Sequence, residues 1–161
     1  MRHAFAAAMF AAVFIALPSA PPANGAARER SDVERELREH AGRNLPGSKR
    51  ELACFLYLTA AENSPQAQEA YTLMRSEAEA GDSIAALYVS AYLRKGFGTA
   101  ASGAAARAFL NVIQDDIGPS QLPPLTSLQD AADALKSGRC APVDEEGAAE
   151  LYTVRPAITP L

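Results

Sequence analysis

The stretch from Ala78 to Gly98 constrains the fold of this chain more than any other feature. Gly81 and Asp82 separate two alanine-rich segments of helical periodicity, and Lys95-Gly96-Phe97-Gly98 closes the second segment. Glycine readily adopts the left-handed conformation that ends helices, and aspartate is a favoured residue at a helix start. The stretch therefore predicts two helices joined by a tight hinge, the second ended by a glycine turn.

The remaining chain predicts more helices and no sheet. Helices are expected at about 31–43, 48–62, 65–80, 84–95, 102–114, 125–137 and 144–154. Residues suited to helix starts precede or open most of these segments: Ser31, Ser48, Pro65, Asp82, Ser102, Thr126 and Asp144. Alternating runs of Val, Ile and Thr, which would indicate strands, are absent. The expected fold class is all-α.

An alanine recurs at a fixed place in three of the predicted helices. Ala70, Ala106 and Ala148 stand four residues after Gln66, Ser102 and Asp144 at the beginnings of these helices, with spacings of 36 and 42 residues between them. A large apolar pair follows each alanine after three residues: Leu73-Met74, Phe109-Leu110 and Leu151-Tyr152. A small residue lets a paired helix approach closely, and a large one fills the space between neighbouring hairpins. The spacing predicts helical hairpins at about 48–81, 82–117 and 125–154.

The central part of the chain resembles the Sel-one-like repeat family, a variant of the tetratricopeptide helical hairpin. The resemblance is carried by Ala78, Gly81, Asp82, Ala85, Val89, Ser90, Leu93, Lys95, Gly96, Gly98, Ala106 and Phe109. It covers Gln66 to Leu110 well and 125–154 thinly, and helix 48–62 lacks the Lys-Gly-x-Gly ending. The family usually has glycine in place of Ser90 and aspartate in place of Ser102.

This resemblance implies a short right-handed α-solenoid of about three repeats, with the helix at 31–43 as an N-terminal cap. Family members serve as scaffolds in envelope assembly, secretion or signalling, so the resemblance also implies a protein or peptide partner held on a concave helical surface. An ordinary alanine-rich helical bundle is the alternative architecture.

The first 25 residues are interpreted as a signal peptide. Ala4 to Leu17 is an apolar run of 14 residues, shorter than the roughly 20 residues that span a bilayer. Small residues up to Gly25 suit cleavage, and cleavage after Ser19 or Ala20 is an alternative, as is an uncleaved anchor. The expected location is periplasmic or secreted, with no stable membrane anchor after cleavage. Residues 26–30 are expected to be a disordered leader and 156–161 a tail.

Charge and residue types argue against several functions. After residue 25 the chain carries 14 basic and 19 acidic side chains, a net charge of −5 without a basic cluster, which disfavours nucleic-acid binding. His40 is the one histidine of that part, and a general base needs partners. No zinc-ligand spacing or strand-linked phosphate loop occurs. The sequence therefore predicts no catalytic residue, no cofactor and no metal.

The best binding candidates lie on the predicted helix 84–95. Tyr88, Tyr92 and Lys95 stand at positions i, i+4 and i+7, beside the apolar stripe. Tyrosine combines apolar area with a hydroxyl and suits protein interfaces. The competing interpretation, favoured for each ring individually, is that both rings pack between hairpins. The expected function is an exported adaptor. The alternatives are a small exported all-α enzyme or enzyme inhibitor, and a degenerate repeat protein without a strong partner.

The two cysteines test the architecture. Cys54 belongs to the first hairpin, and Cys140 follows the first helix of the third. Hairpins stacked about 10 Å apart would hold these residues roughly twice that distance from one another, whereas a disulfide needs Cα atoms within about 7 Å. A regular solenoid therefore predicts two free thiols. A disulfide would instead mean that the last hairpin folds back.

Overall fold

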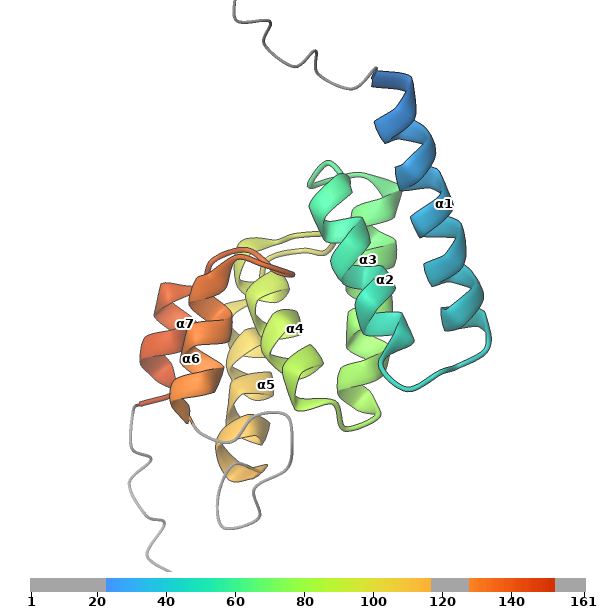
Figure 1. Cartoon of the computed structure of the whole chain (residues 1–161). Helices are drawn as coiled ribbons and strands as arrows, with labels where there is room; N and C mark the ends of the chain where they lie inside the picture. The colour runs from blue at the N-terminus through green and yellow to red at the C-terminus, as the bar shows by residue number, and fades with distance from the viewer. Residues whose placement is uncertain (1–22, 117–127, 153–161) are drawn as a thin grey trace, which may run out of the picture.

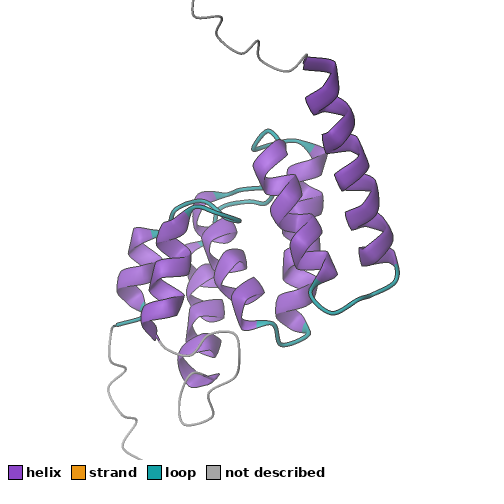
Figure 2. Cartoon of the chain, in the orientation of Figure 1, coloured by secondary structure: helices purple, strands orange, loops and turns teal. Residues whose placement is uncertain are grey.

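The computed structural model describes residues 23–116 and 128–152. Within these ranges the chain forms helices joined by loops, and no strand occurs (Figure 2). The helices are α1 (Ala23–Gly42), α2 (Ser48–Thr59), α3 (Pro65–Glu79), α4 (Ser83–Lys95), α5 (Gly103–Asp116), α6 (Leu128–Ser137) and α7 (Glu145–Glu150). The prediction of an all-α fold is confirmed.

The helices pack in pairs that follow the order of the chain. The pairs are α2 with α3, α4 with α5, and α6 with α7. They lie side by side across the molecule, and α1 lies against α2 at one end (Figure 1). The middle pair joins the other two, since α4 contacts both α3 and α6 while α5 contacts α7.

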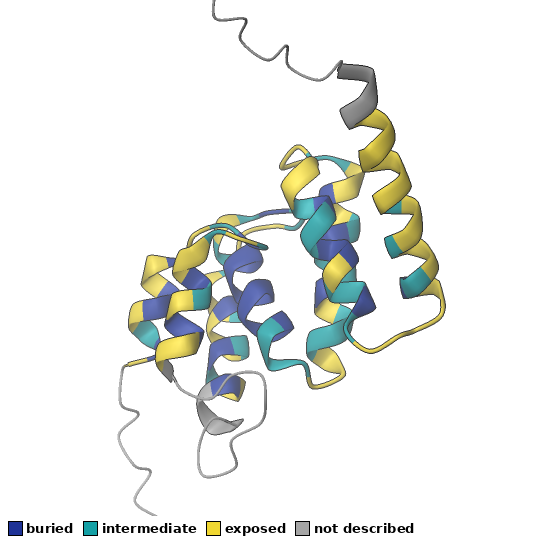
Figure 3. Ribbon diagram, viewed as in Figure 1, coloured by how far each residue is buried: buried dark blue, intermediate teal, exposed yellow. Residues whose placement is uncertain are grey.

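The core centres on α4. All nine residues from Ala85 to Leu93 are buried, so this helix is covered on every side (Figure 3). The three recurring alanines, Ala70, Ala106 and Ala148, are fully buried on the second helix of each pair. Large apolar side chains from the same helices are buried with them: Met74, Leu110 and Leu151. The three alanines and one member of each large apolar pair therefore belong to the core, while Leu73 and Phe109 are partly buried and Tyr152 is exposed.

Several predicted helix starts are confirmed by hydrogen bonds. The side chain of Asp82 accepts from the backbone N–H of Ala85 at 3.0 Å, and Asp144 accepts from Gly147 at 2.9 Å. Ser102 does the same for the N–H of Ala105 at 3.3 Å. Each bond satisfies a backbone donor that a helix leaves unpaired in its first turn.

The glycine turn between α4 and α5 packs against the first helix pair. Gly96 ends α4 with φ 77°, and Gly98 has φ 65°, both in the left-handed region. A Cβ atom on Gly98 would overlap the backbone carbonyl of Ala67 at the start of α3. The Gly98 N–H also donates to the carbonyl of Glu62 at 3.3 Å. Gly98 is therefore required both for its backbone conformation and for close approach.

The first helix differs from the prediction. It begins at Ala23, so the expectation of a disordered leader at 26–30 and a helix start at 31 is wrong. Ser31 lies inside the helix, where its hydroxyl donates to the carbonyl of Arg28 at 2.8 Å. Alanine, arginine and glutamate are strong helix formers, so the helix continues through the residues before Ser31.

The start of α2 also differs from the prediction. Gly47 occupies the cap position with φ 74°, and the Ser48 hydroxyl donates to the carbonyl of Leu45 at 2.6 Å instead of accepting a bond from the helix. Most of the predicted signal peptide, Thr126 and the tail at 156–161 lie outside the described residues.

Candidate functional site

The three residues predicted to bind a partner do not form one surface. Tyr92 is fully buried and Tyr88 retains 9% exposure, whereas Lys95 is exposed. Tyr92 therefore cannot contact a partner in this conformation, and the predicted Tyr88–Tyr92–Lys95 surface is wrong. The competing interpretation, in which the rings pack in the core, describes both tyrosines.

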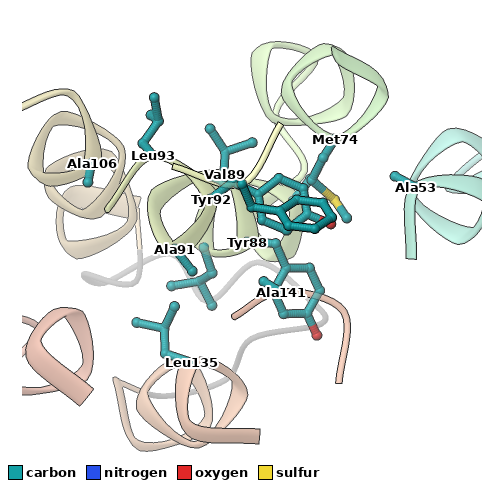
Figure 4. Packing of buried hydrophobic residues seen from close by; sticks show 14 of the residues in the cluster. Ala53, Met74, Tyr88, Val89, Ala91, Tyr92, Leu93, Ala106, Leu135 and Ala141 are labelled. Atoms are coloured by element: carbon teal, nitrogen blue, oxygen red, sulfur yellow. The ribbon is translucent and has the colours of Figure 1, made fainter. Parts of the chain in front are cut away.

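The face of α4 that carries these tyrosines is covered by the loop between α6 and α7. The Tyr92 hydroxyl donates to the backbone carbonyl of Cys140 at 2.8 Å. Ala141 is buried in the same core. Figure 4 shows Ala141 and Leu135 on one side of α4, with Met74 on the other. The concave surface expected along α4 is therefore filled by the protein's own chain.

Cys54 and Cys140 form a disulfide, so the expectation of two free thiols is wrong. Their Cα atoms lie 4.5 Å apart, within the range that a disulfide requires. Cys140 follows the end of α6 in a loop that extends back across α4 to α2, and does not remain at the spacing of a regular stack. The bond links the first and third helix pairs across the middle one.

A pocket of about 330 Å³ opens at the C-terminal end of α2, next to this loop. It lies where the α2–α3, α4–α5 and α6–α7 loops meet. Its walls are largely apolar and are formed by Tyr57, Leu58, Ala60, Phe97 and Pro142. Glu62 contributes the one carboxylate among the lining residues. Leu58 is 65% exposed, the most exposed of the large apolar side chains described. A largely apolar pocket with a few polar groups is the usual form of a binding site.

Aromatic rings in mutual contact form one wall of the pocket. The ring centroids of Tyr57 and Phe97 lie 5.1 Å apart in an edge-to-face arrangement. Both rings contact Tyr92, at 5.9 Å from Tyr57 and 5.0 Å from Phe97. Because Tyr92 is buried and hydrogen-bonded, it supports the buried Phe97 ring and the partly exposed Tyr57 ring. The role of Tyr92 at this site is thus to position other residues.

The polar groups of the pocket are free to bind a ligand. Among the described residues, the Tyr57 hydroxyl has no hydrogen-bond partner and the Glu62 carboxylate makes no ion pair. Partial burial raises the pKa of Tyr57, and the negative charge of Glu62 raises it further. Tyr57 therefore remains a neutral hydroxyl at neutral pH, close enough to Glu62 to feel its charge.

A second polar cluster is fully occupied by its own contacts. Arg94, with 7% side-chain exposure, pairs with Asp144 at 3.0 Å, Glu146 at 3.1 Å and Glu150 at 2.7 Å. Arg107 adds a further bond to Glu150 at 3.0 Å. Burial raises the Glu150 pKa, but the bonds from Arg107 and Arg94 outweigh it and lower the pKa overall. These groups link α4 and α5 to α7.

Sequence reasoning did not identify the pocket because its parts are far apart in the chain. Tyr57, Phe97 and Pro142 come from three different loops or helix ends. Phe97 carried one usable signal, since an aromatic residue between two turn glycines is placed by the turn and not by a helix face. The overlooked residues are therefore Tyr57, Leu58, Glu62 and Phe97.

No protein-family model, curated protein or solved structure matches this chain. In the described ranges no helix is long and apolar enough to cross a membrane. Across the same residues, no three His, Cys, Asp or Glu side chains gather in a group that could hold a metal ion.

Proposed function

We propose that this protein is an exported helical-repeat adaptor that binds a protein or peptide partner at the pocket beside Tyr57, Leu58 and Phe97. The observation that carries the proposal is an apolar pocket of about 330 Å³ whose hydroxyl and carboxylate have no described partner within the protein. Such unpaired groups around a rigid aromatic wall suit a ligand that combines apolar and polar contacts.

The proposed repeat architecture is a short α-solenoid of three hairpins. It is supported by three helix pairs that follow one another along the chain and by full burial of Ala70, Ala106 and Ala148 at equivalent places. In this proposal the third hairpin departs from a regular repeat, since its connecting loop folds back over α4. That departure moves the binding surface from the middle of α4 to the end of α2.

The proposed export of the protein is supported by its disulfide and by the apolar segment at its start. Disulfides persist mainly in oxidising compartments outside the cytoplasm, and Cys54–Cys140 joins residues 86 positions apart. The apolar run Ala4 to Leu17 has the length of a signal-peptide core. A periplasmic or secreted adaptor accounts for both features.

Site-specific photocrosslinking tests the proposal. A benzophenone amino acid is placed at Leu58, at the pocket, or at Val112, which is also exposed but lies on α5 near the end remote from the α4–α5 loop. In an envelope extract of the source organism we expect one stoichiometric crosslinked partner from position 58 and none from position 112. Equal crosslinking from both positions, or none from position 58, would overturn the proposal.

A further inference from the structure

The wall of the pocket includes an aromatic ring that can attract a positive group. Tyr57 and Phe97 present an edge-to-face pair of rings 5.1 Å apart, and Tyr57 is only partly buried. The face of an aromatic ring attracts a lysine ammonium or an arginine guanidinium placed within about 6 Å. Phe97 is buried with 5% exposure, so the ring that can meet a positive group at the pocket is that of Tyr57.

The carboxylate of Glu62 supplies the opposite charge at the same pocket. It lines the pocket and forms no ion pair with any described residue. Its backbone carbonyl accepts from Gly98, which holds the Glu62 backbone beside the Phe97 turn. Its charge is also felt by Tyr57, whose pKa it raises after the larger effect of burial. A carboxylate without an ion-pair partner beside an aromatic ring favours the binding of a positively charged group.

The described lining of the pocket carries a negative side chain and no positive one. None of the described residues that line the pocket is a lysine or an arginine. Arg94, the buried arginine, is held by Asp144, Glu146 and Glu150 at the junction with α7. The chain as a whole has a net charge of −4. Charge complementarity therefore points to a basic partner segment.

We propose that the pocket holds an arginine side chain from a basic peptide segment of the partner. The guanidinium stacks against Tyr57 and pairs with the Glu62 carboxylate, and the aliphatic stem packs along Leu58. Arginine fits better than lysine, because its flat group stacks on rings and bonds a carboxylate through two N–H groups. The stem of a long basic side chain covers apolar surface while its charged end bonds to the acid. This inference rests on the proposed adaptor function.

A titration with synthetic peptides tests the arginine preference. The probe is an acetylated nonapeptide of Gly and Ser with a central arginine. Two comparison peptides carry citrulline, which has nearly the same shape without charge, or leucine. The disulfide-bonded, ¹⁵N-labelled protein is followed through the backbone amides of Gly98 and Gly138, which flank the pocket. We expect the arginine peptide to bind about tenfold more tightly than either comparison peptide at low salt. Equal binding of citrulline or leucine would overturn the inference.

Variants of the protein assign the contact to Glu62. Glu62→Gln keeps the shape of the side chain and removes its charge. We expect it to raise the dissociation constant of the arginine peptide by about tenfold. Glu51→Gln is the matched control, since Glu51 is an exposed acid near the other end of α2. It should leave the dissociation constant unchanged. Unchanged binding in Glu62→Gln, or an equal loss in both variants, would contradict the proposed contact.

The aromatic contribution is tested with Tyr57→Leu, which keeps an apolar side chain and removes the ring. We expect weaker arginine binding with unchanged helical circular dichroism, and unchanged binding would contradict the stacking contact. If Tyr57→Leu loses its helical signal, Tyr57→Phe provides the readout, because a retained ring should retain binding and loss of binding would contradict stacking.

The two proposals can fail separately. Crosslinking from position 58 without any preference for the arginine peptide would overturn this inference and leave the adaptor function standing. Arginine binding without a crosslinked partner would overturn the adaptor function instead.

Discussion

The two junctions between neighbouring helix pairs are held by different forces. At the first junction, α3 and α4 follow one another directly, and the fully buried Met74 belongs to an apolar interface. At the second junction, α4 meets α6 and α5 meets α7 through a buried arginine cluster, a tyrosine hydrogen bond and a nearby disulfide. The first junction has one ion pair, between Arg50 on α2 and Asp82 at the start of α4, whereas the second has three on the single buried side chain of Arg94.

The difference follows from how the chain connects the pairs. Three residues, 80 to 82, separate α3 from α4, so the first junction forms between neighbours in sequence. The last pair is smaller, since α7 has only six residues and little apolar surface to offer. Directional bonds and a covalent link compensate for that small apolar area. We therefore expect the second junction to respond to charge, redox state and pH, and the first to respond mainly to loss of packing.

The largest effect is expected from Arg94→Ala. Asp144 has no side-chain exposure, and removing its partner leaves a buried negative charge. We expect the free energy of unfolding to fall by about 3 to 5 kcal/mol, measured by urea denaturation at neutral pH. Arg75→Ala is the matched control, because its pair with Glu79 is more than half exposed and should contribute little to stability. Similar small losses in both variants would contradict the assigned role of Arg94.

The next effect is expected from removing the disulfide with the double change Cys54→Ser and Cys140→Ser. The bond closes a loop with a sequence separation of 86, and its loss should cost about 2 to 4 kcal/mol. Hydrogen exchange should show the greatest loss of protection in α6 and α7. A uniform loss of protection, including α3, would contradict the proposed difference between the junctions.

A smaller effect is expected from Tyr92→Phe. The change leaves the Cys140 carbonyl without the bond that it accepts at 2.8 Å, at a cost of about 1 kcal/mol. Tyr57→Phe is the control and should change stability little, because its hydroxyl has no described partner. Equal losses in the two variants would contradict the assigned role of the Tyr92–Cys140 hydrogen bond.

Tyr92 also predicts an alkaline pH dependence. Burial raises its pKa, so the folded protein keeps the proton while the unfolded chain loses it above about pH 10. Stability should therefore fall as the pH rises above that value, and the fall should be less steep in Tyr92→Phe. Parallel curves would contradict this assignment.

The smallest effect is expected from the acid titration of Glu150. Its pKa is lowered below 4.5 in the folded protein by Arg107 and Arg94, against the opposing effect of burial. The stabilisation is therefore present above pH 4.5 and is lost as the pH falls through the lowered folded value. The free energy of unfolding is measured from pH 6 to pH 3. At pH 6 wild type should be more stable than Glu150→Gln by less than about 1 kcal/mol, and this difference should disappear as the pH falls.

Met74→Ala separates the two junctions in the same acid experiment. Its loss of packing should lower stability by a similar amount at every pH, since no titrating group is removed. A pH-dependent effect of Met74→Ala would contradict the contrast between an apolar and a polar junction.

Much of the helical structure could be predicted because its causes are local. Asp82, Ser102 and Asp144 bond to backbone groups three residues away, and Gly96 ends α4 through its own φ. Such signals lie within one turn of the residue concerned. The start of α1 was mispredicted for a related reason: Ser31 suits a helix start, but strong helix formers precede it.

The candidate site could not be predicted because it depends on contacts between distant residues. Tyr88 and Tyr92 occupy a helix face that looks available in the sequence, yet residues almost 50 positions later cover it. The pocket at Tyr57 forms only when the loop carrying Pro142 crosses to α2. Periodicity identifies the face of a helix, but it does not say which segment will pack on that face.

For this protein the amino-acid order alone was enough to establish an all-helical chain, the hinge at Gly81-Asp82, the glycine turn at Gly96 and the alanines that allow close packing. Each depends on backbone conformation or side-chain size at one position. Folding in three dimensions determined the Cys54–Cys140 bond, the burial of Tyr92 and the position of the pocket at the end of α2. These features depend on where the last helix pair packs, and that is set by the summed contacts of segments far apart in the chain.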